Sequence, residues 1–206
     1  MIKKHTVLVG VVIAASLLVI ATLLYPGGSL FDKNSIGFDW TKNFISNLFA
    51  AKAVNGADNP SRLWADSAMI FLSVSFALFF IQFSVKIPVR SAANVIKYLG
   101  VAAMLFTFFI VTPLHDVMIN ISSTLYLVSI FYITVFIFKS KLHFFKILCV
   151  ICLLLFYYTL YIYGSGIYTF LPIMQKVNLF STIILILCLH YFTRKEDFEH
   201  LHKSRL

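Results

Sequence analysis

The sequence predicts an all-α fold: a polytopic membrane protein whose six transmembrane helices form a bundle, with an amphipathic helix in the first outer loop. Six apolar segments approach the roughly 20 residues that a helix needs to cross a bilayer. Hydrophobic residues make up 60% of the chain and charged residues only 12%, against about 25% charged in a soluble domain. The expected spans lie near residues 6–25, 67–85, 97–112, 117–138, 147–163 and 173–193. Residues 1–206 therefore form a single membrane domain.

The first segment resembles a signal peptide, because Lys3 and Lys4 precede an apolar stretch. That stretch runs to Tyr25 and ends in Pro26-Gly27-Gly28, without the small-residue pattern of a cleavage site. We expect it to remain as the first helix.

The outer loop, residues 26–66, contains apolar residues at helical spacing. Trp40, Phe44, Ile45, Leu48 and Phe49 fall opposite a polar side, behind Asp39 as N-cap. We expect this helix to lie on the outer membrane surface. Two interpretations stay open: it covers helix ends, or it gates a site that faces the lipid. The pair Asn59-Pro60 then predicts that the second helix starts outside the bilayer.

Lys and Arg are concentrated on one side of the expected membrane. With the N-terminus inside, twelve of the 17 are cytoplasmic, and the outer side carries five basic and five acidic residues. Since positive residues are retained in the cytoplasm, both termini should lie there. The charged tail, residues 194–206, follows the sixth span directly and could continue its helix into the cytoplasm. The net charge of +9 thus reports topology and contact with anionic lipid. This charge does not indicate a nucleic-acid partner, because the basic residues are spread over short segments and form no known nucleic-acid-binding motif.

Polar residues near membrane depth are costly and therefore mark candidate sites. His115 and Asp116 follow Thr112-Pro113-Leu114 between the third and fourth helices, at the expected outer interface. A histidine beside a carboxylate can exchange protons near neutral pH, although a hairpin turn alone also requires polar residues. Asn120 extends the polar strip into the fourth helix.

Lys176 falls in the first turn of the sixth helix, after Pro172, where the helix dipole disfavours a cation. Asp66, Asp116 or a lipid phosphate is the expected compensating anion, and Gln175 beside it adds hydrogen-bonding capacity. Asp66, His115, Asp116 and Lys176 should all lie at one outer level. We assign hypothetical catalytic roles to His115, Asp116 and Asp66. The expected ligand-binding residues are Lys176, Gln175, Asn120, Ser46 and Trp40.

A metal or haem site is not expected, and no cofactor is indicated. His115 and His190 are the only well-embedded histidines, and they lie at opposite membrane surfaces. Cys149 and Cys152 have redox spacing but lack the context of a redox domain, so we interpret them as packing residues.

Several motifs carry a resemblance to a known family. Tyr25-Pro26-Gly27-Gly28-Ser29, the segment Asn43-Phe44-Ile45-Ser46-Asn47-Leu48 and Thr112-Pro113-Leu114-His115-Asp116 are similar to motifs of the bacterial membrane family catalogued as domain of unknown function 998. That family often has aspartate where this chain has Asn47. The resemblance implies six spans and a bacterial inner membrane, and no particular activity.

A more distant similarity is to the alkaline ceramidase-like transmembrane hydrolases, which use serine, aspartate and several histidines around zinc. Ser46 or Ser67, Asp66 and His115 would take those parts here. The paired histidines of that superfamily's last span are missing, which removes most of the metal site.

Two functions follow as expectations. The preferred one is a non-enzymatic protein that binds a lipid, a small amphiphile or a partner helix in an outward-facing polar pocket. The expected partners are membrane lipids and either another membrane protein or a second copy of the chain. The alternative is an outer-face hydrolase or transferase acting on lipid, with His115 as acid or base. A small transporter is a weaker third, because no helix interior shows a charge at the membrane midplane.

Overall fold

The computed structural model describes the backbone of residues 5–203 and the side chains of residues 5–201. Lys3, Lys4 and Arg205, which entered the topology argument, lie outside these residues. The described chain consists of helices joined by loops, and its only β-structure is two isolated β-bridges in one loop. The elements are α1 (Thr6–Leu24), the 3-10 helix η1 (Ile45–Phe49), α2 (Ser61–Ser84), α3 (Arg90–Phe108), the 3-10 helix η2 (Phe109–Val111), α4 (His115–Lys139), α5 (His143–Gly164), α6 (Leu171–Phe192) and α7 (Glu196–Lys203).

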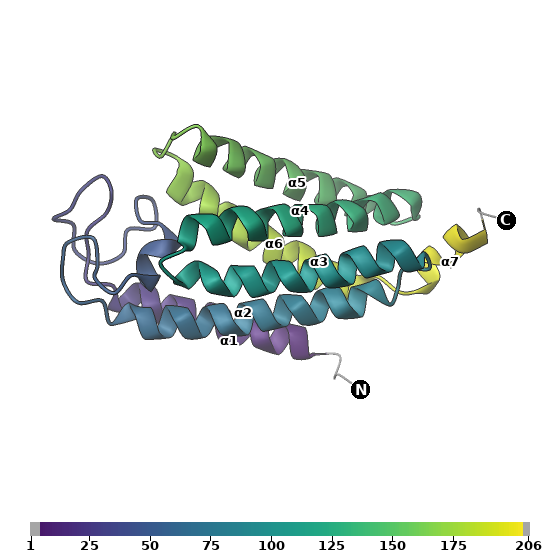
Figure 1. The fold of residues 1–206 in the computed structure, drawn as a ribbon, viewed down its shortest axis with the longest axis horizontal. Coiled ribbons are helices and arrows are strands. Elements are labelled where there is room, and N and C mark those ends of the chain that lie inside the picture. The colour runs from purple at the N-terminus through teal and green to yellow at the C-terminus, as the bar shows by residue number, and fades with distance from the viewer. Residues whose placement is uncertain (1–4, 204–206) are drawn as a thin grey trace.

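Six of these helices are long and apolar enough to cross a membrane, so the predicted helical bundle is confirmed. They run alternately up and down the long axis of the molecule (Figure 1). One end, which we call the loop end, carries residues 25–60 and the connections before α4 and α6. The first and last described residues both lie toward the other end, the terminal end, as an even number of spans requires (Figure 1).

Neighbouring helices pack in chain order, and α6 also contacts α1 and α2. The main core is aromatic and branched-aliphatic, with Phe79 and Phe80 of α2 fully buried against residues of α4 and α6. Helices α2 and α3 approach closely at Gly100, where a Cβ atom would collide with the side chain of Phe80. A smaller cluster at the loop end joins Tyr25, Leu48 and Phe49 to α1 and α2.

Helix α2 begins at Ser61, as the Asn59-Pro60 pair predicts, and so projects beyond the expected span at 67–85. The Asn59 side chain accepts the Ser61 N–H at 3.2 Å and donates to the carbonyl of Ala50 at 2.8 Å. This one amide therefore ties the start of α2 to the preceding loop.

The amphipathic helix expected on the membrane surface is much shorter than its pattern indicates and faces a different way. Only the 3-10 helix η1 forms, and its apolar residues Ile45, Leu48 and Phe49 are buried against the bundle. The expected polar face is also turned inward: Asn43 is fully buried, and its amide donates to the carbonyl of Gly28 at 2.6 Å. Asn47 accepts the N–H of Phe44 at 2.8 Å. These side chains replace the backbone bonds that would have continued an α-helix.

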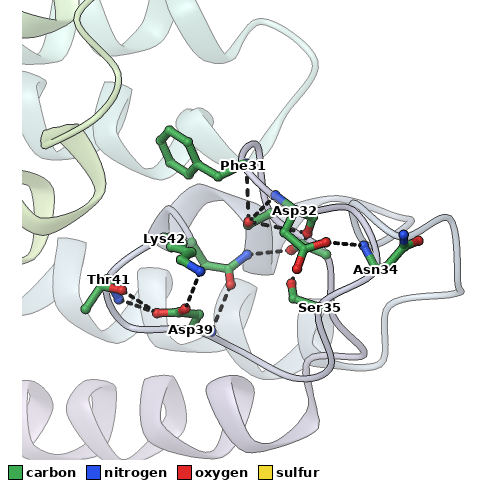
Figure 2. A network of polar contacts seen from close by, with 10 residues as sticks. Phe31, Asp32, Asn34, Ser35, Asp39, Thr41 and Lys42 are labelled. Atoms are coloured by element: carbon green, nitrogen blue, oxygen red, sulfur yellow. Dashed lines mark hydrogen bonds and ion pairs between the residues drawn. The ribbon is translucent and has the colours of Figure 1, made fainter.

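Polar turns fold the rest of the loop without regular structure. Figure 2 shows Asp32 and Asp39 at the centre of two such turns. Asp32 accepts the N–H of Asn34 at 2.9 Å, and Asp39 accepts both the N–H and the hydroxyl of Thr41, at 2.8 and 2.7 Å. The bond from the Thr41 hydroxyl is the main reason that the pKa of Asp39 is lowered.

At the terminal end, α6 stops instead of continuing into the tail. Thr193 is extended, with φ −110° and ψ 145°, and α7 begins three residues later. The ammonium of Lys86, just after α2, donates to the carbonyls of His190 and Thr193 at 3.1 and 2.9 Å. A lysine thus caps the negative end of α6. Burial lowers the pKa of Lys86 to about 8.

Candidate functional site

A cavity of about 560 Å³ opens at the loop end of the bundle. Its walls come from α1, α2, α4, α5 and α6, and most of its lining residues are apolar. One side is closed by residues 43–49, which we call the strap, through Phe44, Ile45, Ser46 and Phe49. Pockets of this size and character suit a small molecule with a large apolar part.

His115 and Asp116 lie at the start of α4 and both line the cavity. Pro113 prevents α3 from continuing, and a carboxylate in the first turn of α4 is favoured by the helix dipole. His115 Nδ1 lies 3.1 Å from Asp116 Oδ1, and the Tyr163 hydroxyl donates to the same oxygen at 2.9 Å. The contact between His115 and Asp116 thus follows the sequence prediction, and α5 supplies a third member.

The carboxylate fixes the tautomer of His115. An ionised carboxylate can only accept hydrogen bonds, so the His115 nitrogen that contacts it, Nδ1, carries the ring proton. In a neutral ring the other nitrogen, Nε2, is then an acceptor. Nε2 is buried and receives no hydrogen bond from any residue in the described part of the chain. The Asp116 side chain is 78% exposed and the His115 side chain 32%, so this group stands at the mouth of the cavity.

Helix α6 adds two amides to the cavity wall. Gln175 lines the cavity and accepts the N–H of Ile45 at 2.7 Å, which attaches the strap to α6. One turn further in, Asn178 also lines the cavity, and its buried Oδ1 has no hydrogen-bond donor among residues 5–201. Buried polar atoms without partners are uncommon and ask for an explanation.

Lys176 does not belong to the cavity. Its ammonium is turned to the strap, where it donates to the carbonyl of Asn43 at 2.6 Å and to that of Pro172 at 2.9 Å. It also lies 5.5 Å from the centre of the Phe38 ring, and the residue is 6% exposed. Instead of Asp66 or Asp116, backbone carbonyls, an aromatic face and the nearby charge of Asp39 compensate this cation. The structure therefore gives Lys176 a role in holding the strap.

Asp66 is also separate from the His115 group. It pairs with Arg62 one turn earlier on α2, at 3.5 Å, and it is not among the residues that line the cavity. Within the described chain, neither a hydrogen bond nor an ion pair joins Asp66 or Lys176 to His115 or Asp116. The four ionisable residues expected at one level are thus divided into three separate sets, because equal depth does not fix their positions around the bundle.

The remaining candidates are divided between the cavity and the surface. Ser46 lines the cavity from the strap. Trp40 packs edge-on against Phe38 and is 45% exposed, and Asn120 lies on an exposed face of α4. Neither Trp40 nor Asn120 lines the cavity. Ser67, the other serine considered for a hydrolase, donates to the carbonyl of Leu63 in its own helix.

A second cavity of about 210 Å³ continues toward the middle of the bundle. It shares Met69, Ser123, Phe156 and Asn178 with the first cavity, so the two adjoin along one wall. Its inner end is marked by the buried pair Tyr126 and Thr182, whose hydroxyls lie 3.3 Å apart. From Gln175 to Thr182 along α6 the depth is roughly 10 Å, at 1.5 Å per residue.

Metal-binding groups are dispersed: among the side chains of residues 5–201, no three from His, Cys, Asp or Glu lie close enough together to hold an ion. Cys149 and Cys152 are free and buried in the core.

The sequence did not single out the link between Tyr163 and Asp116, nor the partnerless oxygen of Asn178. Tyr163 was one of several tyrosines near the end of α5, and three of the others, Tyr157, Tyr158 and Tyr161, are exposed.

Comparison of the chain with protein-family models, with curated proteins and with solved structures finds no match. The arguments for function therefore depend on the geometry of the cavity.

Proposed function

We propose that this membrane protein binds a single-chain amphiphile, such as a lipid with one acyl chain, in the cavity at the loop end. The observation that carries the proposal is the cavity itself: a largely apolar space of about 560 Å³ whose mouth holds the His115, Asp116 and Tyr163 group. An amphiphile matches both halves of that arrangement, because its chain needs an apolar wall and its head needs hydrogen bonds.

The adjoining inner cavity supports the same proposal. It offers a continuation between α2, α4 and α6, lined by Leu72, Phe76 and Leu179 among others. Each methylene group moved from water into such a space gains about 0.8 kcal/mol. A chain already dissolved in lipid gains less, so the head group and the fit must supply the selectivity.

The membrane is proposed to be a bacterial inner membrane, with the loop end outside and both termini in the cytoplasm. The concentration of Lys and Arg near the terminal end supports this orientation, as does the resemblance to the bacterial family described above. Ser35→Cys at the loop end should react with a membrane-impermeant maleimide in intact cells, whereas Lys141→Cys, at an exposed position between α4 and α5, should react only after the cells are opened. The reverse pattern would overturn the orientation.

Filling the cavity tests the binding proposal. Leu160 of α5 lines it, whereas Leu154 on the same helix is 63% exposed. Native mass spectrometry on the purified full chain should show a bound amphiphile in the wild type and in Leu154→Trp, and its loss in Leu160→Trp. Equal retention in the two variants would contradict the proposal.

A second pair on α4 guards against a folding defect in Leu160→Trp. Ser123 lines both cavities, and the next residue, Thr124, is exposed. Ser123→Phe should lose the bound amphiphile and Thr124→Phe should keep it. Unfolding midpoints of all four variants show whether each protein is folded.

The contact of His115 with Asp116 favours a second candidate, hydrolysis of a lipid ester at the mouth of the cavity. His115 Nε2 would take a proton from water as the water oxygen attacks the ester carbonyl. The C–O bond to the alcohol then breaks, and the alcohol leaves with that proton, giving a carboxylic acid and an alcohol. General bases contribute about 10²–10⁴ in rate, so His115→Gln should slow release of dodecanoate from monododecanoyl glycerol by that factor. Equal release by both proteins excludes this candidate.

A further inference from the structure

We infer that the amphiphile's head group donates hydrogen bonds and carries no negative charge, as a glycerol hydroxyl or an ammonium does and a phosphate or carboxylate does not. The inference rests on the proposed function, and it names the chemical class of the ligand. Two features of the cavity carry it: the character of its unused polar atoms and the sign of its charges.

Two buried polar atoms of the larger cavity, His115 Nε2 and Asn178 Oδ1, have no hydrogen-bond partner in the described chain, and both are acceptors. Asp116 holds the proton of His115 on Nδ1, so the partnerless Nε2 presents a lone pair. Asn178 Oδ1, also without a donor in the described chain, presents another. A buried acceptor without a donor is unfavourable, so a ligand that supplies O–H or N–H groups removes that cost. A phosphate dianion or a carboxylate has only acceptors to offer and would leave both atoms unsatisfied.

The charge at the cavity is negative. Asp116 lines the mouth, and no Lys or Arg in residues 5–201 lines either cavity. The cations of the loop end are mostly engaged elsewhere: Lys42 with Asp39, Lys52 with Asp58, Arg62 with Asp66, and Lys176 with two carbonyls. An anionic head would lose its hydration beside a carboxylate without gaining a cation, which is the costly case for a charge.

Lys176 is the residue that the sequence would assign to an anionic head, and its geometry argues against that assignment. Its ammonium is 2.6 Å from the carbonyl of Asn43, on the strap. Moving it into the cavity would leave that carbonyl without its donor and remove one of the two side-chain bonds from α6 that hold the strap.

Four photo-crosslinking amphiphiles test the inference. They share one dodecyl chain with a terminal diazirine and differ only in the head: glycerol, ammonium, phosphate or carboxylate. The full-length protein is placed in phosphatidylcholine nanodiscs, and saturable labelling of residues that line the cavity is quantified by peptide mass spectrometry. Leu160→Trp and Ser123→Phe define the labelling that depends on the cavity.

The glycerol or the ammonium probe should saturate at a concentration at least about tenfold below that of the phosphate and carboxylate probes, a difference of about 1.4 kcal/mol. His115→Phe and Asn178→Leu should each raise the glycerol concentration needed by about tenfold, because each removes an acceptor. The order of the two donor probes on the wild-type protein separates the two sources: the ammonium probe saturates at the lower concentration if the site takes an amine, and the glycerol probe does so if it takes a hydroxyl.

Two results overturn the inference in distinguishable ways. If the phosphate or carboxylate probe saturates at or below the glycerol concentration, and Leu160→Trp abolishes its labelling, the head-group inference is wrong and the binding function stands. If Leu160→Trp and Ser123→Phe leave the labelling by all four probes unchanged, the proposed function itself fails and the inference with it.

Discussion

His115 Nδ1 lies 3.1 Å from Asp116 Oδ1, at the first turn of α4. Tyr163 from the end of α5 donates to the same oxygen at 2.9 Å. This arrangement fixes the imidazole tautomer and joins α4 to α5 where the cavity opens. The bond between α4 and α5 can be broken by removing a single hydroxyl, that of Tyr163.

Tyr163→Phe removes that hydroxyl and keeps the ring. The free energy of unfolding should fall by about 0.5–1.5 kcal/mol, the net contribution of one hydrogen bond, and the affinity for the amphiphile should fall with it. Tyr161→Phe is the matched control, because Tyr161 is 63% exposed on the same helix. Thermal unfolding in one detergent measures both, and equal effects would show that the Tyr163 hydroxyl does not stabilise the mouth.

The strap depends on Lys176 and Gln175, which bind its backbone from α6. Lys176→Met leaves the carbonyl of Asn43 without its donor, so hydrogen exchange of amides in residues 44–49 should accelerate about tenfold or more. Global stability is a poorer readout, because the substitution also removes the cost of burying a cation.

Lys42→Met is the control for this experiment, since the Lys42 side chain is 51% exposed and lies 3.9 Å from Asp39. Exchange in the strap should change little there, as exposed ion pairs contribute about 0–1 kcal/mol. Acceleration in Lys42→Met as large as in Lys176→Met would remove the assigned role of Lys176.

Gly100 sets the approach of α3 to α2. Gly100→Ala places a Cβ atom against the base of the Phe80 side chain, and such overpacking costs about 1–3 kcal/mol. Gly164 at the end of α5 has open space around its Cβ position, so Gly164→Ala should be neutral or slightly stabilising. Unfolding midpoints compare the two, and equal midpoints would contradict the packing described for α2 and α3.

Lys86 gives a pH dependence whose sign follows from its surroundings. Burial lowers its pKa in the folded state to about 8 from 10.5. Between these values the unfolded chain holds the proton and the folded chain has released it, so stability rises with pH there. Below pH 8 both states are protonated and the contribution is constant.

Lys86→Met should therefore show a shallower rise in unfolding free energy between pH 8 and 10.5 than the wild type. Denaturant titrations at several pH values measure the two slopes. Lys97→Met is the control. It leaves Lys86 in place and should therefore retain the wild-type slope. A steeper slope in Lys86→Met would reverse the assigned sign.

The sequence predicted the spans well because hydrophobic length is a local property. Helix α1 ends within one residue of its predicted boundary, and α6 begins two residues before its own. The ends facing water were less predictable, since α2 and α3 extend beyond the apolar segments as polar helix.

The strap shows why apolar spacing alone was insufficient in the loop. Phe44, Ile45, Leu48 and Phe49 satisfy a helical pattern, yet that pattern does not say whether amide side chains compete for the backbone. Asn43 and Asn47 do so here, since their side-chain oxygens accept the N–H groups of Asp39 and Phe44, and Asn43 also donates to the distant carbonyl of Gly28. Tertiary bonds of this kind leave little trace in sequence spacing.

The site was predictable only where its members are adjacent in the chain. His115 and Asp116 meet because they are neighbours, whereas Asp66 and Lys176 were expected to join them on depth alone. Residues at the same depth in the membrane can still face different directions around the bundle. Asp66 on α2 faces Arg62, and Lys176 on α6 faces the strap.

The central claim is that the loop-end cavity holds an amphiphile. An experimental density map of the full-length protein in phosphatidylcholine nanodiscs tests this most directly. The account predicts one elongated density that begins beside His115 and runs between α2, α4 and α6 toward Thr182. A cavity closed by inward movement of the strap and of Leu160, with no density inside, would contradict it.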